Sequence, residues 1–341
     1  MSRTIYSGCT RPLRAFPIGE KENGKIEYKI TNYNCDHLEK NRSGNWIEVG
    51  TSRREFGATA IVRDYLELPC GVCPSCKLQK ARQWSHRCVA ESMLHKHNYF
   101  VTFTYNEKTI PAGGFAPSLR KSDLQKFWKR LRAEGFVFRY FACGEYGSTT
   151  FRPHYHAIIF GLELPDGDLI PYKRVEDGML YSSQTLERVW QLGYVVVGEV
   201  NEQTCNYVSR YTVKKSKEDM QRYYDLFEVE PEFICMSRRP GIGHDWFLKH
   251  GLDMYHNQWY SYKGESGAAR LYPTKYWTNL LEELDSEFYE AYKASQKEFS
   301  ILRKESIFRD DKRDFRAILR DQEAQRIKQT EILKERSKCD A

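Results

Sequence analysis

The sequence predicts an α+β protein in which a ferredoxin-like antiparallel sheet carries helices on one face. Between residues 99 and 218, segments rich in β-branched and aromatic residues alternate with amphipathic segments in the order β-α-β-β-α-β-α. The first six elements match the split β-α-β pattern of ferredoxin-like folds. A cysteine-rich segment precedes this region and a charged segment follows it, so we expect three parts, residues 1–98, 99–260 and 261–341. A metal would stabilise the first part, and the last would be a charged helical tail.

The elements of the central part follow one another at regular intervals. Strands are expected where β-branched and aromatic residues dominate, at residues 99–105, 136–145, 154–162 and 194–200. Helices are expected at residues 122–135, 182–193 and 202–218. Ser122 and Gln125 form a predicted capping box at the start of the first helix. The side chains expected to face the core from the first two helices are Leu124, Phe127, Trp128, Leu131, Leu186, Val189 and Trp190.

Composition and charge favour an intracellular protein with a polyanionic partner. The chain has 341 residues, 40% of them hydrophobic and 29% charged, and its formal net charge is +7. We see no secretory signal at the N-terminus and no segment apolar enough to cross a bilayer, so we expect no membrane partner. Lys and Arg concentrate in residues 77–98 and 120–132, which favours phosphate binding, although a solvated helix face has the same pattern.

The cysteines predict a structural metal site. Ten cysteines occur in the chain, and "PCGVCPSC" places Cys70, Cys73 and Cys76 at C-x2-C-x2-C spacing. Four thiolates can close a tetrahedral zinc site, and the fourth ligand would be Cys9 or Cys88. The same triple spacing also serves iron–sulfur clusters, and reduced thiols without a metal are the third interpretation.

A second candidate metal site lies at "RPHYHAIIFG", residues 152–161. Side chains of a strand alternate between its faces, so His154 and His156 would point to one face and Tyr155 to the other. The preceding strand ends at Glu145, and a hairpin would bring this carboxylate to the two imidazoles. Such a set suits Mg²⁺ or Mn²⁺ with open positions for phosphate oxygens, and zinc would also accept it. Taken alone, the His-x-His pair is more typical of ordinary hydrogen-bonding residues on a strand.

The predicted helix at residues 202–218 adds two phenols. Tyr207 and Tyr211 are four residues apart and therefore share one helix face, which Arg210 and Lys214 extend. A phenol is a weak acid, so it needs a nearby cation or metal to act as a nucleophile. Two phenols beside basic side chains suit attack on a phosphodiester. The alternative is an aromatic and basic face that contacts nucleic acid without chemistry, or a half-buried aromatic pair.

These motifs carry a resemblance to a known family. "RPHYHAIIFG" together with "YVSRYTVKK" resembles the HUH endonuclease superfamily, which is named after its His–hydrophobe–His motif. With "PCGVCPSC" followed by "WSHRC", the chain resembles the replication initiators of microviruses, which are small single-stranded DNA phages, and particularly their gokushovirus-like branch. "FVTFTYNE" (100–107) is similar to that family's first motif strand. The specific motifs cover residues 70–216.

The resemblance implies an endonuclease and strand transferase that starts rolling-circle replication of a circular phage genome in the bacterial cytoplasm. His154, His156 and Glu145 would hold Mg²⁺ or Mn²⁺. Tyr207 or Tyr211 would nick the single-stranded origin and form a 5′-phosphotyrosine, while the second tyrosine would serve in the closing strand transfer. The free 3′ end would be extended by a host polymerase. The chain has no Walker A loop, so a host helicase is also expected.

The basic residues take supporting roles in this interpretation. Lys214 would stabilise phosphate charge, with the adjacent Lys215 as an alternative. The expected contacts with the DNA backbone are Lys126, Lys129, Arg130, Arg132, Arg210 and Lys215. Other interpretations are a relaxase or transposase of another HUH family, a non-catalytic zinc-stabilised single-strand-binding protein, and a metal hydrolase without a covalent intermediate.

Overall fold

The computed structural model describes residues 8–50, 58–147, 150–175, 178–210, 217–264, 267–310 and 315–336. The chain forms two compact units, one of residues 80–284 and one of residues 1–79 together with 285–341. Among the described residues, no helix combines the length and the apolar composition that crossing a membrane requires. Each unit is described separately below.

A seven-stranded sheet forms the centre of the unit of residues 80–284, and all its pairings are antiparallel. Its strands are β7 (Asn98–Tyr105), β8 (Arg139–Tyr146), β9 (Pro153–Phe160), β10 (Leu169–Val175), β11 (Gly178–Ser183), β12 (Gly193–Glu199) and β13 (Phe233–Met236). Their order is β10-β11-β12-β7-β9-β8-β13. The four predicted strands are the adjacent β12, β7, β9 and β8, and the predicted antiparallel sheet is confirmed.

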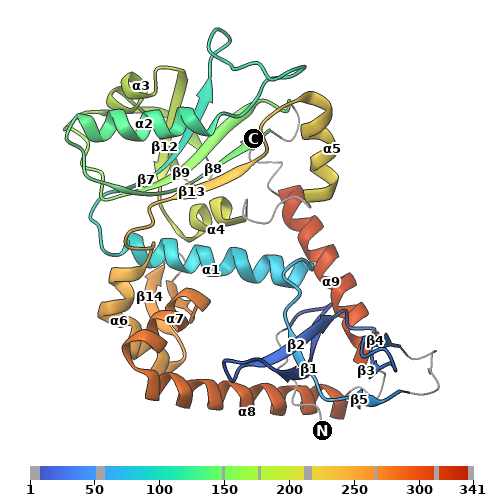
Figure 1. Cartoon of the computed structure of the whole chain (residues 1–341). Coiled ribbons are helices and arrows are strands. Elements are labelled where there is room, and N and C mark those ends of the chain that lie inside the picture. Colours follow the sequence, from blue (N-terminus) through green and yellow to red (C-terminus); the bar gives the residue numbers. More distant parts are fainter. Residues whose placement is uncertain are drawn as a thin grey trace. The chain divides into compact units, whose positions relative to one another are not determined.

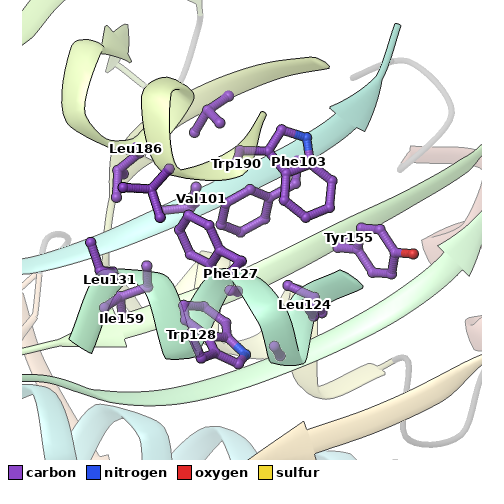
Figure 2. Close-up of a cluster of buried hydrophobic side chains, with 14 of the residues drawn as sticks. Val101, Phe103, Leu124, Phe127, Trp128, Leu131, Tyr155, Ile159, Leu186 and Trp190 are labelled. Carbon is purple, nitrogen blue, oxygen red and sulfur yellow. The ribbon is translucent and has the colours of Figure 1, made fainter. Parts of the chain in front are cut away.

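Two helices cover one face of this sheet, α2 (Lys121–Ala133) and α3 (Gln184–Trp190) (Figure 1). Figure 2 shows their aromatic and aliphatic side chains packed on those of β7 and β9. The helical side chains expected to face the core are all buried. They meet every second residue of each strand, such as Val101, Phe103 and Tyr105, because strand side chains alternate between faces.

The structure departs from the predicted elements at several ends. Helix α2 begins at Lys121 with Arg120 as its N-cap and no side-chain cap, so the capping box predicted at Ser122 is wrong. The hydroxyl of Ser183 caps α3 instead, where it accepts a hydrogen bond from the backbone N–H of Leu186. The predicted helix at 202–218 begins with α4 (Glu202–Arg210), and residues 211–216 lie outside the described part of the chain. Helix α5 (Lys217–Phe227) follows.

Helix α4 and the second half of α1 (Pro74–Ser92) lie on the other face of the sheet (Figure 1). The rings of Trp84 and Phe141 are 5.1 Å apart between α1 and β8. The guanidinium of Arg87 lies between the rings of Trp84 and Tyr276, 4.1 and 3.9 Å from their centroids. It thereby joins α1 to the last elements of this unit, which are α6 (His244–Asn257), β14 (Tyr260–Gly264), β15 (Gly267–Leu271) and α7 (Lys275–Leu284).

The unit of residues 1–79 and 285–341 contains two three-stranded sheets, ordered β2-β1-β6 and β4-β3-β5. The strands are β1 (Leu13–Glu20), β2 (Ile26–Thr31), β3 (His37–Lys40), β4 (Trp46–Val49), β5 (Ala60–Val62) and β6 (Leu66–Leu68). Helices α8 (Ser286–Asp310) and α9 (Phe315–Arg336) complete the unit. Ile318 and Leu319 of α9 are buried, and Glu323 pairs with Arg11 at 2.8 Å. The charged C-terminal region is therefore helical and packs in part on N-terminal residues.

Candidate metal centres and tyrosine site

Three predicted metal ligands meet on the sheet face opposite α2 and α3. Glu145 of β8 is directly opposite His154 of β9, and Cys143 is opposite His156. One oxygen of Glu145, Oε1, lies 2.9 Å from Nε2 of His154 and 3.1 Å from Nε2 of His156. Glu145 and His156 are buried, whereas the side chain of His154 is 18% exposed. The three groups could therefore hold a metal ion that is reached from the side of His154.

Hydrogen bonds at the far ring nitrogens orient both histidines. Nδ1 of His154 lies 3.0 Å from the carbonyl oxygen of Arg152, which only accepts hydrogen bonds, so this nitrogen carries the proton. The lone pair of Nε2 is then free for a metal. Nδ1 of His156 lies 3.0 Å from the hydroxyl of Thr102, and the ring of Phe100 stacks on the imidazole. Sequence reasoning singled out the strand of Thr102 but not this contact, which requires the register of β7 on β9.

Helix α4 places Tyr207 beside the two histidines. The side-chain oxygen of Asn201 accepts a hydrogen bond from the backbone N–H of Thr204 and so caps the helix. Cys205 and Val208 are buried, which fixes the rotation of the helix. The hydroxyl of Tyr207 lies 3.5 Å from Nε2 of His156, and the two rings meet edge to face. A phenol oxygen, two imidazoles and a carboxylate thus surround one point.

The remaining residues predicted near Tyr207 are only partly described. Arg210 is half-buried at the end of α4. Tyr211, Lys214 and Lys215 lie outside the described residues.

Tyr155 faces away from this site, as expected from the alternation of a strand. Its side chain is fully buried among the residues under α2, and its hydroxyl lies 2.6 Å from that of Tyr105. The hydroxyl also donates to the carbonyl of Arg120 and accepts from the N–H of the same residue. Burial raises the pKa of Tyr155, so a phenolate nucleophile is disfavoured there.

The second candidate metal centre lies in the other unit and contains four thiols. Cys9, Cys70, Cys73 and Cys76 place their sulfur atoms within 4.8 Å of one another. The sulfur of Cys9 is 3.5 Å from that of Cys70 and 3.7 Å from that of Cys73. Tetrahedral zinc with bonds of about 2.3 Å would separate sulfur atoms by about 3.8 Å, so the four thiols fit zinc.

The environment of these thiols favours negative charge at the centre. The hydrogen bond with Cys9 lowers the pKa of Cys73 to about 3, while the same contact raises the pKa of Cys9. Burial raises the pKa of Cys76 to about 11. The backbone N–H groups of Cys70 and Cys73 donate to sulfur atoms of this cluster, which stabilises thiolates. The alternative fourth ligand, Cys88, is buried in the unit of residues 80–284 and is not part of this group.

The predicted DNA-contacting residues on α2 divide into two groups. Lys126, Lys129 and Arg132 are exposed. Arg130 is not directed to solvent, because its guanidinium donates to the carbonyls of Val189 and Trp190 at the end of α3. Arg130 therefore holds two helices together.

Known proteins match this chain in sequence. Residues 98–216 match the model of the replication-associated protein ORF2 family. The chain is 28% identical over 301 residues to replication-associated protein ORF2 of Spiroplasma virus 4, and the match covers 85% of both chains. Replication-associated protein VP4 of Bdellovibrio phage phiMH2K is 28% identical over 202 residues, covering 57% of this chain and 60% of that protein.

A third match is replication-associated protein ORF4 of Chlamydia phage 1, which is 29% identical over 156 residues, covering 43% of this chain and 38% of that protein. No solved structure matches the chain. The matched residues 98–216 contain the Glu145–His154–His156 group and Tyr207. The chain is therefore a relative of phage replication-associated proteins and contains a region of the ORF2 family at residues 98–216.

Proposed function

We propose that this protein initiates rolling-circle replication of a small single-stranded DNA phage by nicking the origin through a covalent tyrosine intermediate. The observation that carries the proposal is the hydroxyl of Tyr207, 3.5 Å from Nε2 of a histidine that also meets Glu145 and His154. The names of the related phage proteins support a role in replication. Residues 99–260 would form an HUH nickase domain between the cysteine-rich region 1–98 and the charged region 261–341.

The chain's own groups suggest how the nick would form. When bound, Mg²⁺ or Mn²⁺ would act as a Lewis acid on the scissile phosphate. Glu145, His154 and His156 would hold and orient the ion, and the exposed edge of His154 would leave room for phosphate oxygens. The phenol oxygen of Tyr207 would form a bond to phosphorus as it loses its proton, and the bond from phosphorus to the 3′ oxygen would break. The product is a 5′-phosphotyrosine and a 3′ hydroxyl.

The remaining assignments extend the same proposal. Tyr211 would serve in the strand transfer that closes the circle, and Lys214 or Lys215 would neutralise phosphate charge. The four thiols would bind zinc and organise the N-terminal region. A host polymerase would extend the 3′ hydroxyl, and a host helicase would separate the strands.

The direct test is formation of a covalent adduct. The protein is incubated with single-stranded origin DNA and Mn²⁺, and a protein–DNA adduct is sought on a denaturing gel. We expect an adduct with the wild type and none with the double variant Tyr207→Phe/Tyr211→Phe. The single variants show which tyrosine attacks first. Tyr155→Phe is the matched control, because it removes a phenol from the core side of the same strand and should keep the adduct.

Two outcomes would contradict the proposal. If the wild type binds the DNA without forming an adduct, the protein is a non-catalytic single-strand-binding protein. If the double variant still cleaves the DNA, the metal centre acts as a hydrolase and tyrosine is not the nucleophile.

A further inference from the structure

The sheet face that carries the metal-binding residues extends to an exposed aromatic ring on β12. Val195 and Val197 of this strand are buried under α2 and α3, so Tyr194 points to the opposite face, the face of Glu145 and His154. Tyr194 is 65% exposed although β12 is an inner strand of the sheet. A large aromatic side chain this exposed on an inner strand is available to a partner.

The strand register places Tyr194 in one row with the metal-binding residues. Tyr194 is opposite Thr104 of β7, and Thr104 is opposite His154 of β9, which in turn is opposite Glu145. Neighbouring strands are about 4.8 Å apart, so the Cα atoms of Tyr194 and His154 are separated by about 10 Å. A few nucleotides of an extended single strand would cover that distance.

Helix α4 occupies a different part of the same face. Tyr207 contacts Phe100 and His156, with ring centroids 6.0 and 5.1 Å away, and these residues belong to neighbouring rows. The row of Tyr194 remains exposed, and its metal-site end is the partly exposed His154. A strand of DNA that reaches the metal site can therefore continue towards Tyr194.

The β10–β11 hairpin continues this face with one apolar and one basic residue. Ile170 is opposite Ser182, and Lys173 is opposite Leu180. A Cβ atom built on Gly198 of β12 would lie 3.3 Å from the side chain of Leu180, which places Leu180 and its partner Lys173 on the face of Tyr194. Ile170 is 43% exposed and Lys173 is exposed.

We propose that Tyr194 stacks on a base of single-stranded DNA beside the phosphate at the metal site, and that Lys173 contacts the backbone further along. This inference rests on the proposed function and names the path of its substrate. Aromatic rings stack on every base, and cations neutralise phosphates, so an aromatic ring followed by a lysine suits DNA bound without sequence readout. A protein partner would find little apolar area in this row beyond Ile170 and Tyr194.

Equilibrium binding to fluorescent oligothymidylate, without added Mg²⁺ or Mn²⁺ and at fixed salt, tests the proposal. We expect Tyr194→Ala to raise Kd about 5- to 100-fold, the effect of losing one stacked base. Tyr194→Phe should bind like the wild type because its ring remains. Lys173→Ala should reduce the dependence of binding on salt. Tyr28→Ala is the matched control, since Tyr28 is an exposed tyrosine on β2 in the other unit.

The proposal and the proposed function can fail separately. Unchanged binding by Tyr194→Ala overturns the stacking proposal, and equal losses in Tyr194→Ala and Tyr194→Phe assign the effect to the hydroxyl and overturn it too. A wild type that forms no adduct overturns nicking alone, because the binding assay requires no bond to tyrosine. Adduct formation with unchanged Tyr194→Ala binding overturns stacking alone.

Discussion

At the scale of single residues, the candidate metal centre depends on neighbours that hold its ligands in place. Each histidine presents Nε2 to the same oxygen of Glu145 while Nδ1 meets another group, Arg152 for one ring and Thr102 for the other. Such contacts set which nitrogen carries the proton and how the ring is oriented. The Thr102 hydroxyl is therefore a positioning group for His156.

Replacement of Thr102 tests this role. Thr102→Val keeps the shape of the side chain but removes the oxygen 3.0 Å from Nδ1 of His156. We expect the affinity for Mn²⁺, measured by titration calorimetry, to fall about 10- to 100-fold. Thr102→Ser keeps the hydroxyl and should bind Mn²⁺ nearly as the wild type does. Equal affinities of the valine variant and the wild type would contradict the role.

At the scale of the elements, the thiol cluster joins two distant parts of the N-terminal region. Cys70, Cys73 and Cys76 come from one short segment that leads into α1, whereas Cys9 comes from the segment before β1. The first cysteine is 61 positions from Cys70, so a bound metal would close a long loop. We expect such a closure to stabilise the small sheets that lie between the two segments.

Zinc content distinguishes the two candidates for the fourth ligand. Cys9→Ser removes one of the four grouped sulfur atoms, so the purified protein should contain less zinc by mass spectrometry and unfold at a lower temperature. Cys88→Ala should keep the wild-type zinc content because Cys88 is buried elsewhere. Loss of zinc in Cys88→Ala but not in Cys9→Ser would reverse the assignment.

At the scale of the whole molecule, the two candidate metal centres belong to different compact units. The Glu145–His154–His156 group lies in the unit of residues 80–284, and the four thiols lie in the other. The net charge of +7 favours a polyanionic partner, and the exposed lysines of α2 are part of that charge.

The salt dependence of single-stranded DNA binding measures how the exposed lysines contribute. Lys126→Ala/Lys129→Ala should reduce the slope of log K against log salt by about 0.7 for each phosphate that the variant no longer neutralises. Arg130→Ala is the contrasting variant. Its guanidinium bonds to α3, so we expect a lower melting temperature and an unchanged slope. An unchanged slope in the lysine variant would exclude α2 from the DNA-binding surface.

Predictions from the sequence were most accurate where a short-range pattern decides the structure. The four long strands and the inward side chains of α2 and α3 follow from periodicity, and the structure contains them. The hairpin β10–β11 and strand β13 were missed, because short and partly exposed strands depend on the neighbours they pair with. The cap at Ser122 was wrong because the bonds between Tyr155 and Arg120 set the start of α2 one residue earlier.

By itself, the sequence determined which side chains share a face. His154 and His156 point together and away from Tyr155 because every strand alternates its side chains. Only the tertiary structure decided which distant residues join them. Strand register brings Glu145 and Thr102 to the histidines, and the packing of α4 brings Tyr207. The choice of Cys9 over Cys88 in the thiol cluster has the same reason, since contacts across long loops depend on how whole elements pack.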